Sequence, residues 1–233
     1  MRKVLFALLF LSTVSVAQAQ NLQVHYDFGE TRKHVTTTFE MFKPDKWGNT
    51  FSFIDFDFNY GDKNSPSGAY MEIARCLNFW GGPLSAQIEY NGGLGGYAIA
   101  PSQYSGGSYA INNAWLAGVD YFIHSKDFSR TLNLKALAKN IVGKNYTPQF
   151  TGVWTVQMLS KKLTFTGFAD LWWEKDTYAN AGTTANPVFI TEPQLWYNFT
   201  PNISAGSEVE VSSNFAGNEG FMVNPTLAVK WNF

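Results

Sequence analysis

The sequence has little charge, a single cysteine and, after its first residues, no long apolar run. Charged residues make up 15% of the chain, against about 25% in ordinary soluble domains. Basic and acidic residues nearly balance, with 17 Lys and Arg against 18 Asp and Glu, so the basic footprint of a nucleic-acid-binding protein is missing. Cys76 has no second cysteine to pair with. We therefore expect no nucleic-acid partner, and we expect Cys76 to be a buried or lipid-facing small side chain.

The only long apolar segment stands at the start of the chain. Arg2 and Lys3 precede an apolar run from Val4 to Val16, and Ala17-Gln18-Ala19 then fits the small-residue rule for signal-peptide cleavage. We expect residues 1–19 to be a secretory signal peptide and residues 20–233 to form one domain. That domain contains no apolar stretch long enough for a transmembrane helix.

Aromatic residues are abundant, at 17% of the chain, and they alternate with polar ones. Within residues 49–60, Ile54, Phe56 and Phe58 alternate with Asp55 and Asp57. Such period-two alternation predicts twelve strands, at residues 21–28, 34–42, 49–60, 69–80, 83–91, 110–122, 130–140, 149–159, 162–174, 188–199, 202–212 and 221–233. A soluble sandwich or lipocalin-like barrel would turn the apolar face inward, and a membrane barrel would turn it outward. Three features favour an all-β, transmembrane, antiparallel up-and-down β-barrel of about twelve strands.

The first feature is the final strand. Apolar residues occupy alternate positions there and end on an aromatic residue: Phe221, Val223, Leu227, Val229, Trp231 and Phe233. An apolar edge strand of this kind favours aggregation in a soluble protein. It resembles the assembly signal of bacterial outer-membrane barrels, so we expect the barrel-assembly machinery to be a partner through Phe233.

The second feature is the alternation of long and short connections, which is typical of these barrels. The predicted long, external connections are Gly61–Gly68, Gly92–Tyr109, Asn140–Pro148, Lys175–Pro187 and Ser213–Gly220. The predicted short, periplasmic ones are Gly81-Gly82, Ser160-Lys161 and Thr200-Pro201. The turn at Lys43–Gly48 is longer than this rule expects, and the first external loop is shorter.

The third feature is the position of aromatic residues near strand ends, which suits two interfacial girdles in a lipid bilayer. They are Tyr60, Phe79, Trp80, Tyr90, Tyr121, Trp173, Tyr197, Phe199, Trp231 and Phe233. Together the three features predict a protein of the outer membrane of a Gram-negative bacterium, in contact with its lipid.

A family resemblance supports this interpretation. Residues 40–55, reading Glu-Met-Phe-Lys-Pro-Asp-Lys-Trp-Gly-Asn-Thr-Phe-Ser-Phe-Ile-Asp, and then Tyr70-Met71-Glu72, are similar to the early signature of Tsx-like nucleoside-specific channel proteins. Glu40, Trp47, Asp55 and Glu72 match that signature. The resemblance implies a narrow, monomeric channel for nucleosides or similar small polar solutes.

If lipid covers the apolar face, the alternation points carboxylates into the lumen: Glu40, Asp55, Asp57, Glu72, Glu89, Asp120, Asp170, Glu192, Glu208 and Glu210. Lys135, Lys139 and Lys230 share that face, whereas Arg75 falls on the lipid side and lies either near an interface or inward at a bulge. Such a lumen would concentrate cations. Alternatively, the carboxylates are only hydrated, or pair with the lysines to fill a narrow barrel.

Aromatic side chains also fall on the inward phase. Phe168, Trp172 and Trp196 lie among Asp170, Glu192 and Gln194, and an aromatic face beside hydrogen-bonding groups suits a nucleobase. The alternative is that these rings plug the lumen. Phe51 and Phe53 break the phase of their strand and predict either a bulge or an interior aromatic pair.

Two other functions remain open. A closed structural or adhesive barrel would have the same pattern, with the long loops as constrictions or binding surfaces. A barrel lipid hydrolase needs a Ser and a His together on the outer surface, but His25 and His34 fall inward and His124 lies in a predicted periplasmic turn. We therefore expect no enzyme activity and no cofactor.

Overall fold

The computed structural model describes residues 19–30, 32–59, 65–99, 102–175 and 185–233, so the expected signal peptide lies outside the described residues apart from Ala19. The strands are β1 (Ala19–Asp27), β2 (Val35–Asp45), β3 (Gly48–Phe58), β4 (Gly68–Leu77), β5 (Leu84–Ile99), β6 (Ser102–His124), β7 (Arg130–Ile141), β8 (Tyr146–Met158), β9 (Leu163–Glu174), β10 (Asn186–Thr191), β11 (Gln194–Asn198), β12 (Ile203–Ser213) and β13 (Phe221–Asn232). Over these ranges, no helix is long and apolar enough to cross a membrane.

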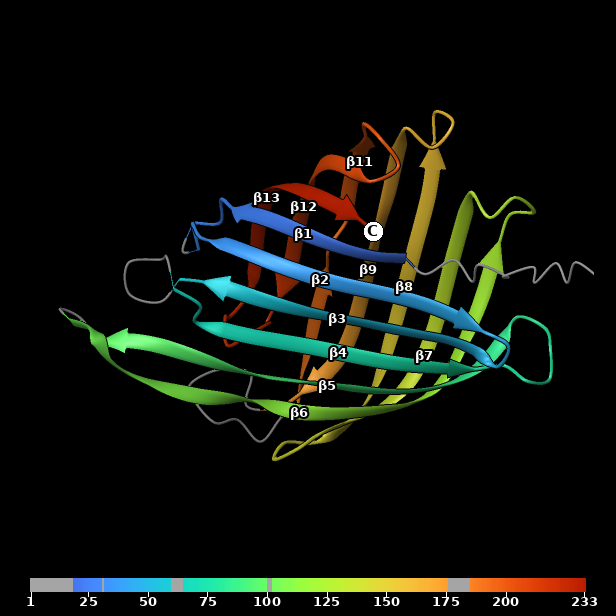
Figure 1. Ribbon diagram of the computed structural model, residues 1–233. Helices are drawn as coiled ribbons and strands as arrows, with labels where there is room; N and C mark the ends of the chain where they lie inside the picture. Colours follow the sequence, from blue (N-terminus) through green and yellow to red (C-terminus); the bar gives the residue numbers. More distant parts are fainter. Residues whose placement is uncertain (1–18, 31, 60–64, 100–101, 176–184) are drawn as a thin grey trace, which may run out of the picture.

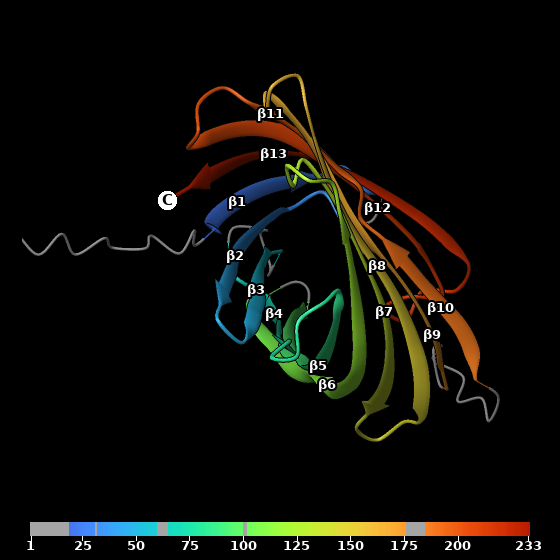
Figure 2. The same cartoon turned by 90° about the vertical axis from the view of Figure 1, so that its right-hand side faces the viewer.

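The strands form one closed antiparallel sheet. β13 pairs with both β12 and β1, which closes the barrel and places the first and last strands side by side (Figure 1). β10 and β11 lie one after the other between β9 and β12 (Figure 2). They keep one register, and the ladder is interrupted at Glu192 and Pro193 because proline has no N–H to donate. The wall is therefore a barrel of twelve strands, one of which is broken, and the predicted fold class is confirmed.

The wall bends closely around this proline. Gly167 lies opposite Pro193 with φ of 156°, and a Cβ at Gly167 would come within 2.5 Å of the carbonyl oxygen of Glu192. Glycine at this position lets the two strands approach each other where the hydrogen-bond ladder is broken.

Two predicted connections are wrong. Lys43–Gly48 is not a long turn, because β2 continues to Asp45, which pairs with Gly48 and leaves only Lys46 and Trp47 between the strands. Gly48 has φ of 140°, and a Cβ there would lie 2.1 Å from the carbonyl oxygen of Cys76, so only glycine fits this turn. Pro44 and Gly48 therefore belong to the paired strands and do not lengthen the turn.

The predicted loop Gly92–Tyr109 is instead the end of a long hairpin. β5 and β6 pair beyond their neighbours (Figure 1), with Gly95 opposite Tyr109 and Tyr97 opposite Gly107. A Cβ at Gly95 would lie 2.3 Å from the ring of Tyr109. The glycines that suggested a loop have no side chain, and this leaves room for the tyrosine ring of the residue opposite each of them.

Aromatic side chains gather at the barrel end where β1 begins, β13 ends and the short turns lie. Half or more of the side chain is exposed for Trp47, Phe79, Trp80, Phe199, Trp231 and Phe233. Arg75 lies near this end, and both its guanidinium NH₂ groups donate to Asp45, at 2.7 and 2.9 Å. Of the two positions expected for Arg75, the structure therefore shows the one near an interface. Tyr60 of the expected girdles lies outside the described residues.

Candidate functional site

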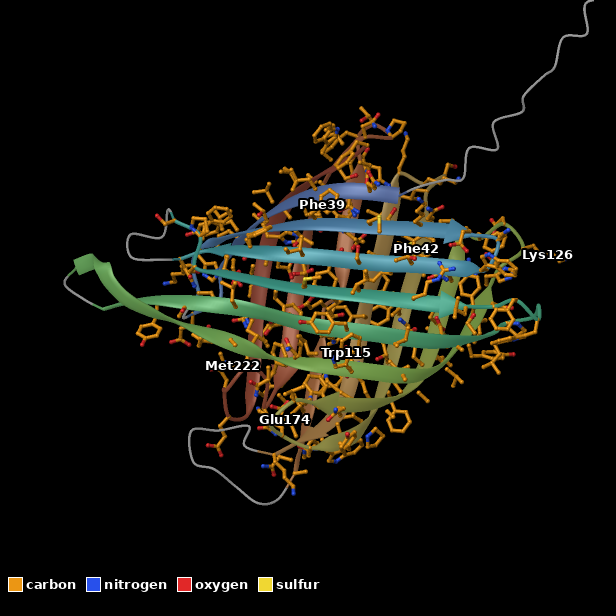
Figure 3. The ribbon with its side chains drawn as sticks, turned by 60° about the horizontal axis from the view of Figure 1, so that its bottom comes forward. Phe39, Phe42, Trp115, Lys126, Glu174 and Met222 are labelled. Carbon is orange, nitrogen blue, oxygen red and sulfur yellow. The ribbon has the colours of Figure 1, made fainter. Side chains whose placement is uncertain are left out.

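The apolar side chains point out of the barrel and the polar ones point in. Along β1, Leu22, Val24 and Tyr26 are 37%, 38% and 44% exposed, whereas Gln23 and His25 are 2% and 4% exposed. The same alternation runs through β13, and Figure 3 shows side chains leaving both faces of the wall, with outward Phe39 and Trp115 among those labelled. An apolar outer band of this kind is typical of outer-membrane barrels. The polar inner face is therefore the candidate functional surface.

All the carboxylates expected at the site lie on this inner face. Register pairs Asp57 with Thr36 and Asp55 with Thr38, and each threonine hydroxyl donates to its aspartate, at 2.8 and 2.5 Å. The others reach the lumen from several walls: Glu72 from β4, Glu89 from β5, Asp170 from β9, Glu192 from the break between β10 and β11, and Glu208 from β12. Glu89, Asp120 and Glu210 are buried, at 7%, 4% and 6% exposure, and the other expected carboxylates are partly exposed.

A row of hydrogen bonds follows β1 through the interior. Asn21 donates to Glu40 at 2.9 Å, Gln23 donates to Asn21 at 2.9 Å, and the His25 Nε2 lies 3.0 Å from Gln23 Oε1. The other ring nitrogen of His25 lies 3.1 Å from the Thr226 hydroxyl on β13. This row holds the inner surface on both sides of the seam between the first and last strands, and it uses His25 as a structural group.

The loop between β1 and β2 lies at the barrel end away from the start of β1, and its side chains reach the inner wall. Arg32 donates to Glu210 at 2.6 Å and to Asp27 at 3.3 Å. Burial lowers the pKa of Arg32, but the two carboxylates outweigh burial and raise the pKa above its ordinary value. Arg32 therefore remains charged and holds this loop against the inner wall; the alternation rule could not find it, since Arg32 lies outside every strand.

The two lumenal tryptophans are each covered by an ammonium group. Lys230 Nζ lies 3.9 Å from the ring centroid of Trp196, and Lys139 Nζ lies 3.9 Å from that of Trp172. Trp196 donates to Gln194 at 2.8 Å and is fully buried. Sequence alternation places both residue types inside, but only the strand register decides which lysine meets which ring.

These tryptophans do not lie together. Trp196 pairs with Thr164 on β9, whereas Trp172 is itself on β9, eight residues further along, and this separation corresponds to about 26 Å at the rise of a strand. Phe168 packs beside the buried cluster that contains Trp172. The structure thus places Phe168 beside the cluster that contains Trp172 and places Trp196 elsewhere.

An apolar cluster inside the barrel was not expected. It comprises Ala114, Leu116, Leu137, Ile141, Trp172, Val188 and Ile190, and Phe215 of the β12–β13 loop packs against it. Leu116 and Val188 are each 1% exposed. Their positions in the alternation place them on the inward face. The many aspartates and glutamates on that face indicated a polar lumen and gave no sign of an apolar cluster. The cluster packs between β6, β7, β9 and β10, and two of these strands also carry the lumenal carboxylates Asp120 and Asp170.

The other aromatic and reactive residues singled out in the sequence pack against neighbouring side chains. Phe51 and Phe53 form an interior pair with ring centroids 6.0 Å apart and no register shift, so the predicted bulge is absent from β3. The Cys76 thiol lies inside, 3.3 Å from Gln87 Oε1. His124 ends β6 and stacks on Phe128 at 4.2 Å.

Comparison with known proteins gives a family. Residues 19–233 match the family described as a domain of unknown function, DUF5020. The chain belongs to this family. Comparison with curated proteins finds no match.

Solved structures similar to this DUF5020 chain are outer-membrane barrels. The NanC porin is 11% identical with a TM-score of 0.57, and the match covers 92% of this chain and 100% of that one. OmpT of Vibrio cholerae is 6% identical with a TM-score of 0.45, covering 93% and 97%. The outer-membrane channel DcaP of Acinetobacter baumannii is 10% identical with a TM-score of 0.45, covering 93% and 96%. The NanC likeness supports the fold alone, and these comparisons do not confirm the Tsx-like resemblance.

Proposed function

We propose that this DUF5020 protein is a channel of the Gram-negative outer membrane through which small polar solutes diffuse passively. The observation that carries the proposal is the set of partly exposed carboxylates on the inner wall, from Asp55 and Glu72 on one side to Asp170 and Glu208 on the other. Water-filled lumens lined with carboxylates concentrate cations and repel anions. The fold of the NanC porin agrees with this proposal.

Single-channel recording in planar bilayers tests the proposal. The mature protein should give reproducible conductance steps in KCl, and a KCl gradient should produce a reversal potential of the sign expected for cation preference. A variant with Glu72→Gln and Asp170→Asn should move that reversal potential toward zero, whereas Glu219→Gln on an exposed external loop should leave it unchanged. Absence of conductance from folded protein would contradict the channel.

The apolar cluster favours a second candidate, a closed structural or adhesive barrel. Phe215 packs against that cluster from an external loop, and Arg32 holds another loop to the inner wall. A barrel that is filled in this way would fold normally and remain silent in the same recordings. We expect the protein to act as a monomer in either case, with Phe233 contacting the barrel-assembly machinery.

Nucleosides are the leading solutes by resemblance, with Phe168 and Trp172 as candidate stacking residues at one place and Trp196 as a separate, fully buried candidate. A base that stacks on Trp172 must displace the ammonium of Lys139 from its ring. Uptake of a radiolabelled nucleoside into liposomes, compared between wild type and Trp172→Ala, tests this site. Unchanged saturation behaviour in the variant would remove Trp172 from the proposal.

A further inference from the structure

At one place in the acidic lumen, carboxylates from two neighbouring strands lie beside an acceptor that has no donor. Glu72 lies directly opposite Asn91 in the β4–β5 register, and Glu89 is two residues from Asn91 on the same inner face. Directly opposite residues on one face have Cβ atoms about 4.5–5.5 Å apart. The three side chains therefore lie within reach of one small bound group.

The hydrogen bonds at this place are incomplete. Tyr70 donates to Glu72 Oε1 at 2.6 Å and Gln87 donates to Glu89 Oε2 at 2.7 Å. Among the described residues, none donates to the second oxygen of either carboxylate, and Asn91 Oδ1 is buried without a partner, in a side chain that is 5% exposed. Leaving a buried acceptor unpaired is unfavourable, so such a group commonly marks a missing partner.

The charges at this place are also incompletely balanced. Glu72 interacts electrostatically with Glu89 beside it, with Asp170 across the lumen and with Lys139. Lys135 lies near Asp170 as well, but it is directly opposite Asp120 in the β6–β7 register. The local sum is therefore negative, which favours a cation as the missing partner.

An aromatic ring borders the same place. Phe53 is directly opposite Glu72 on β3, and its ring centroid lies 6.0 Å from that of Tyr70. Both side chains are partly exposed to the lumen. Aromatic faces attract cations, most strongly when these have lost water, and a hydrocarbon body also packs well on them. No group of His, Cys, Asp and Glu side chains in the described ranges could hold a metal ion.

We propose that Glu72, Glu89 and Asn91 form a subsite for a small primary organic ammonium ion. Three N–H donors of the ammonium match the three acceptors that lack donors, and charge-assisted bonds of this kind are the strong ones. The carbon body of the ion lies against Phe53. This inference rests on the proposed channel function, and it names the class of solute that such a channel would favour.

Binding to the folded protein in detergent micelles tests the subsite without requiring transport. In isothermal titration calorimetry, n-butylammonium chloride should bind saturably to wild type, and tetramethylammonium chloride, which has the same charge but no N–H donor, should bind at least about tenfold more weakly. Glu72→Gln and Asn91→Ala should each weaken butylammonium binding by about tenfold, Asn91→Asp should strengthen it, and Glu219→Gln should not change it. Because the two-ligand comparison uses wild type alone, it stands even if a variant misfolds.

The outcomes separate this inference from the channel itself. Equal binding of the two ammonium ions, or none of either, overturns the subsite, and the KCl conductance measured in parallel then shows whether the channel stands without it. Saturable butylammonium binding that is sensitive to Glu72 and Asn91, in a protein without conductance, would support the subsite and contradict the channel.

Discussion

Arg32 of the β1–β2 loop and Glu210 of β12 are 178 residues apart in the chain, and the guanidinium of Arg32 donates to the carboxylate of Glu210 at 2.6 Å. The carboxylate is almost fully enclosed, since only 7% of the Glu210 side chain is exposed, against 31% for Arg32. Ser212 and Asn224 also donate to Glu210, at 3.0 and 3.1 Å. This pair links the β1–β2 loop to β12, which lies beyond β13 in the barrel wall.

Removing Arg32 should therefore destabilise the barrel. Arg32→Ala leaves Glu210 enclosed without its cation, and we expect the free energy of unfolding in micelles to fall by about 2 kcal/mol, less than for a fully buried pair because Arg32 is partly in water. Urea titration with heat-modifiable gel mobility as the readout measures this. Adding Glu210→Gln should recover part of the loss, and a double variant that is less stable than Arg32→Ala would contradict the explanation.

The stability of the same end of the barrel should depend on pH through His34. Its Nε2 lies 3.5 Å from Asp57 Oδ1, and the hydrogen bond to Asp57 raises the pKa of His34 above its ordinary 6.5, despite burial. A raised pKa in the folded state means that the stabilisation is complete below about pH 6.5 and is lost as the pH rises through the folded value. The stability difference between wild type and His34→Gln should therefore be larger at pH 5.5 than at pH 9. An equal difference at both pH values would exclude this linkage.

Alternation in the sequence predicted which side chains face the lumen, because a closed barrel in lipid forces every strand to separate polar from apolar residues. The inward aspartates of β3 and the outward Leu22, Val24 and Tyr26 of β1 illustrate this rule. The same rule could not predict that Lys139 lies over Trp172, or that Arg32 meets Glu210. Those contacts depend on register and loop path across strands distant in the sequence.

Glycine was the main source of error. Gly95 and Gly107 suggested a loop, since glycine is common in turns, yet each lies opposite a tyrosine in the long β5–β6 hairpin. The ring covers the space that a side chain would have filled. A single sequence cannot distinguish a glycine that forms a turn from one that makes room for an aromatic ring, because the residue is the same in both cases.

Two strand glycines offer a matched test of close packing. At Gly118 on β6 a Cβ would lie 2.1 Å from the carbonyl oxygen of Ala136, whereas at Gly152 on β8 it would meet nothing within 4 Å. Neither has a positive φ. Gly118→Ala should reduce the free energy of unfolding by about 1–3 kcal/mol, as overpacking does, and Gly152→Ala should be neutral or slightly stabilising. Urea titration of both variants in the same detergent measures the two free energies of unfolding. Equal losses in the two variants would contradict the packing argument.

The ring of Phe233 should matter for assembly in cells more than for stability. Phe233 is 50% exposed on the outer face, and its ring lies beside those of Phe39 and Trp231, at centroid distances of 6.0 and 5.0 Å. Phe233→Ala keeps the backbone bond from Phe233 N–H to Gln20, which is 3.1 Å long. We therefore expect normal refolding into micelles but a severalfold lower yield of folded barrel in cell envelopes, with Phe221→Ala, an equally outward aromatic of β13, as the control. If both variants assemble as well as wild type, the assembly machinery does not recognise this ring; if Phe233→Ala also fails to refold in micelles, the ring supports the fold itself.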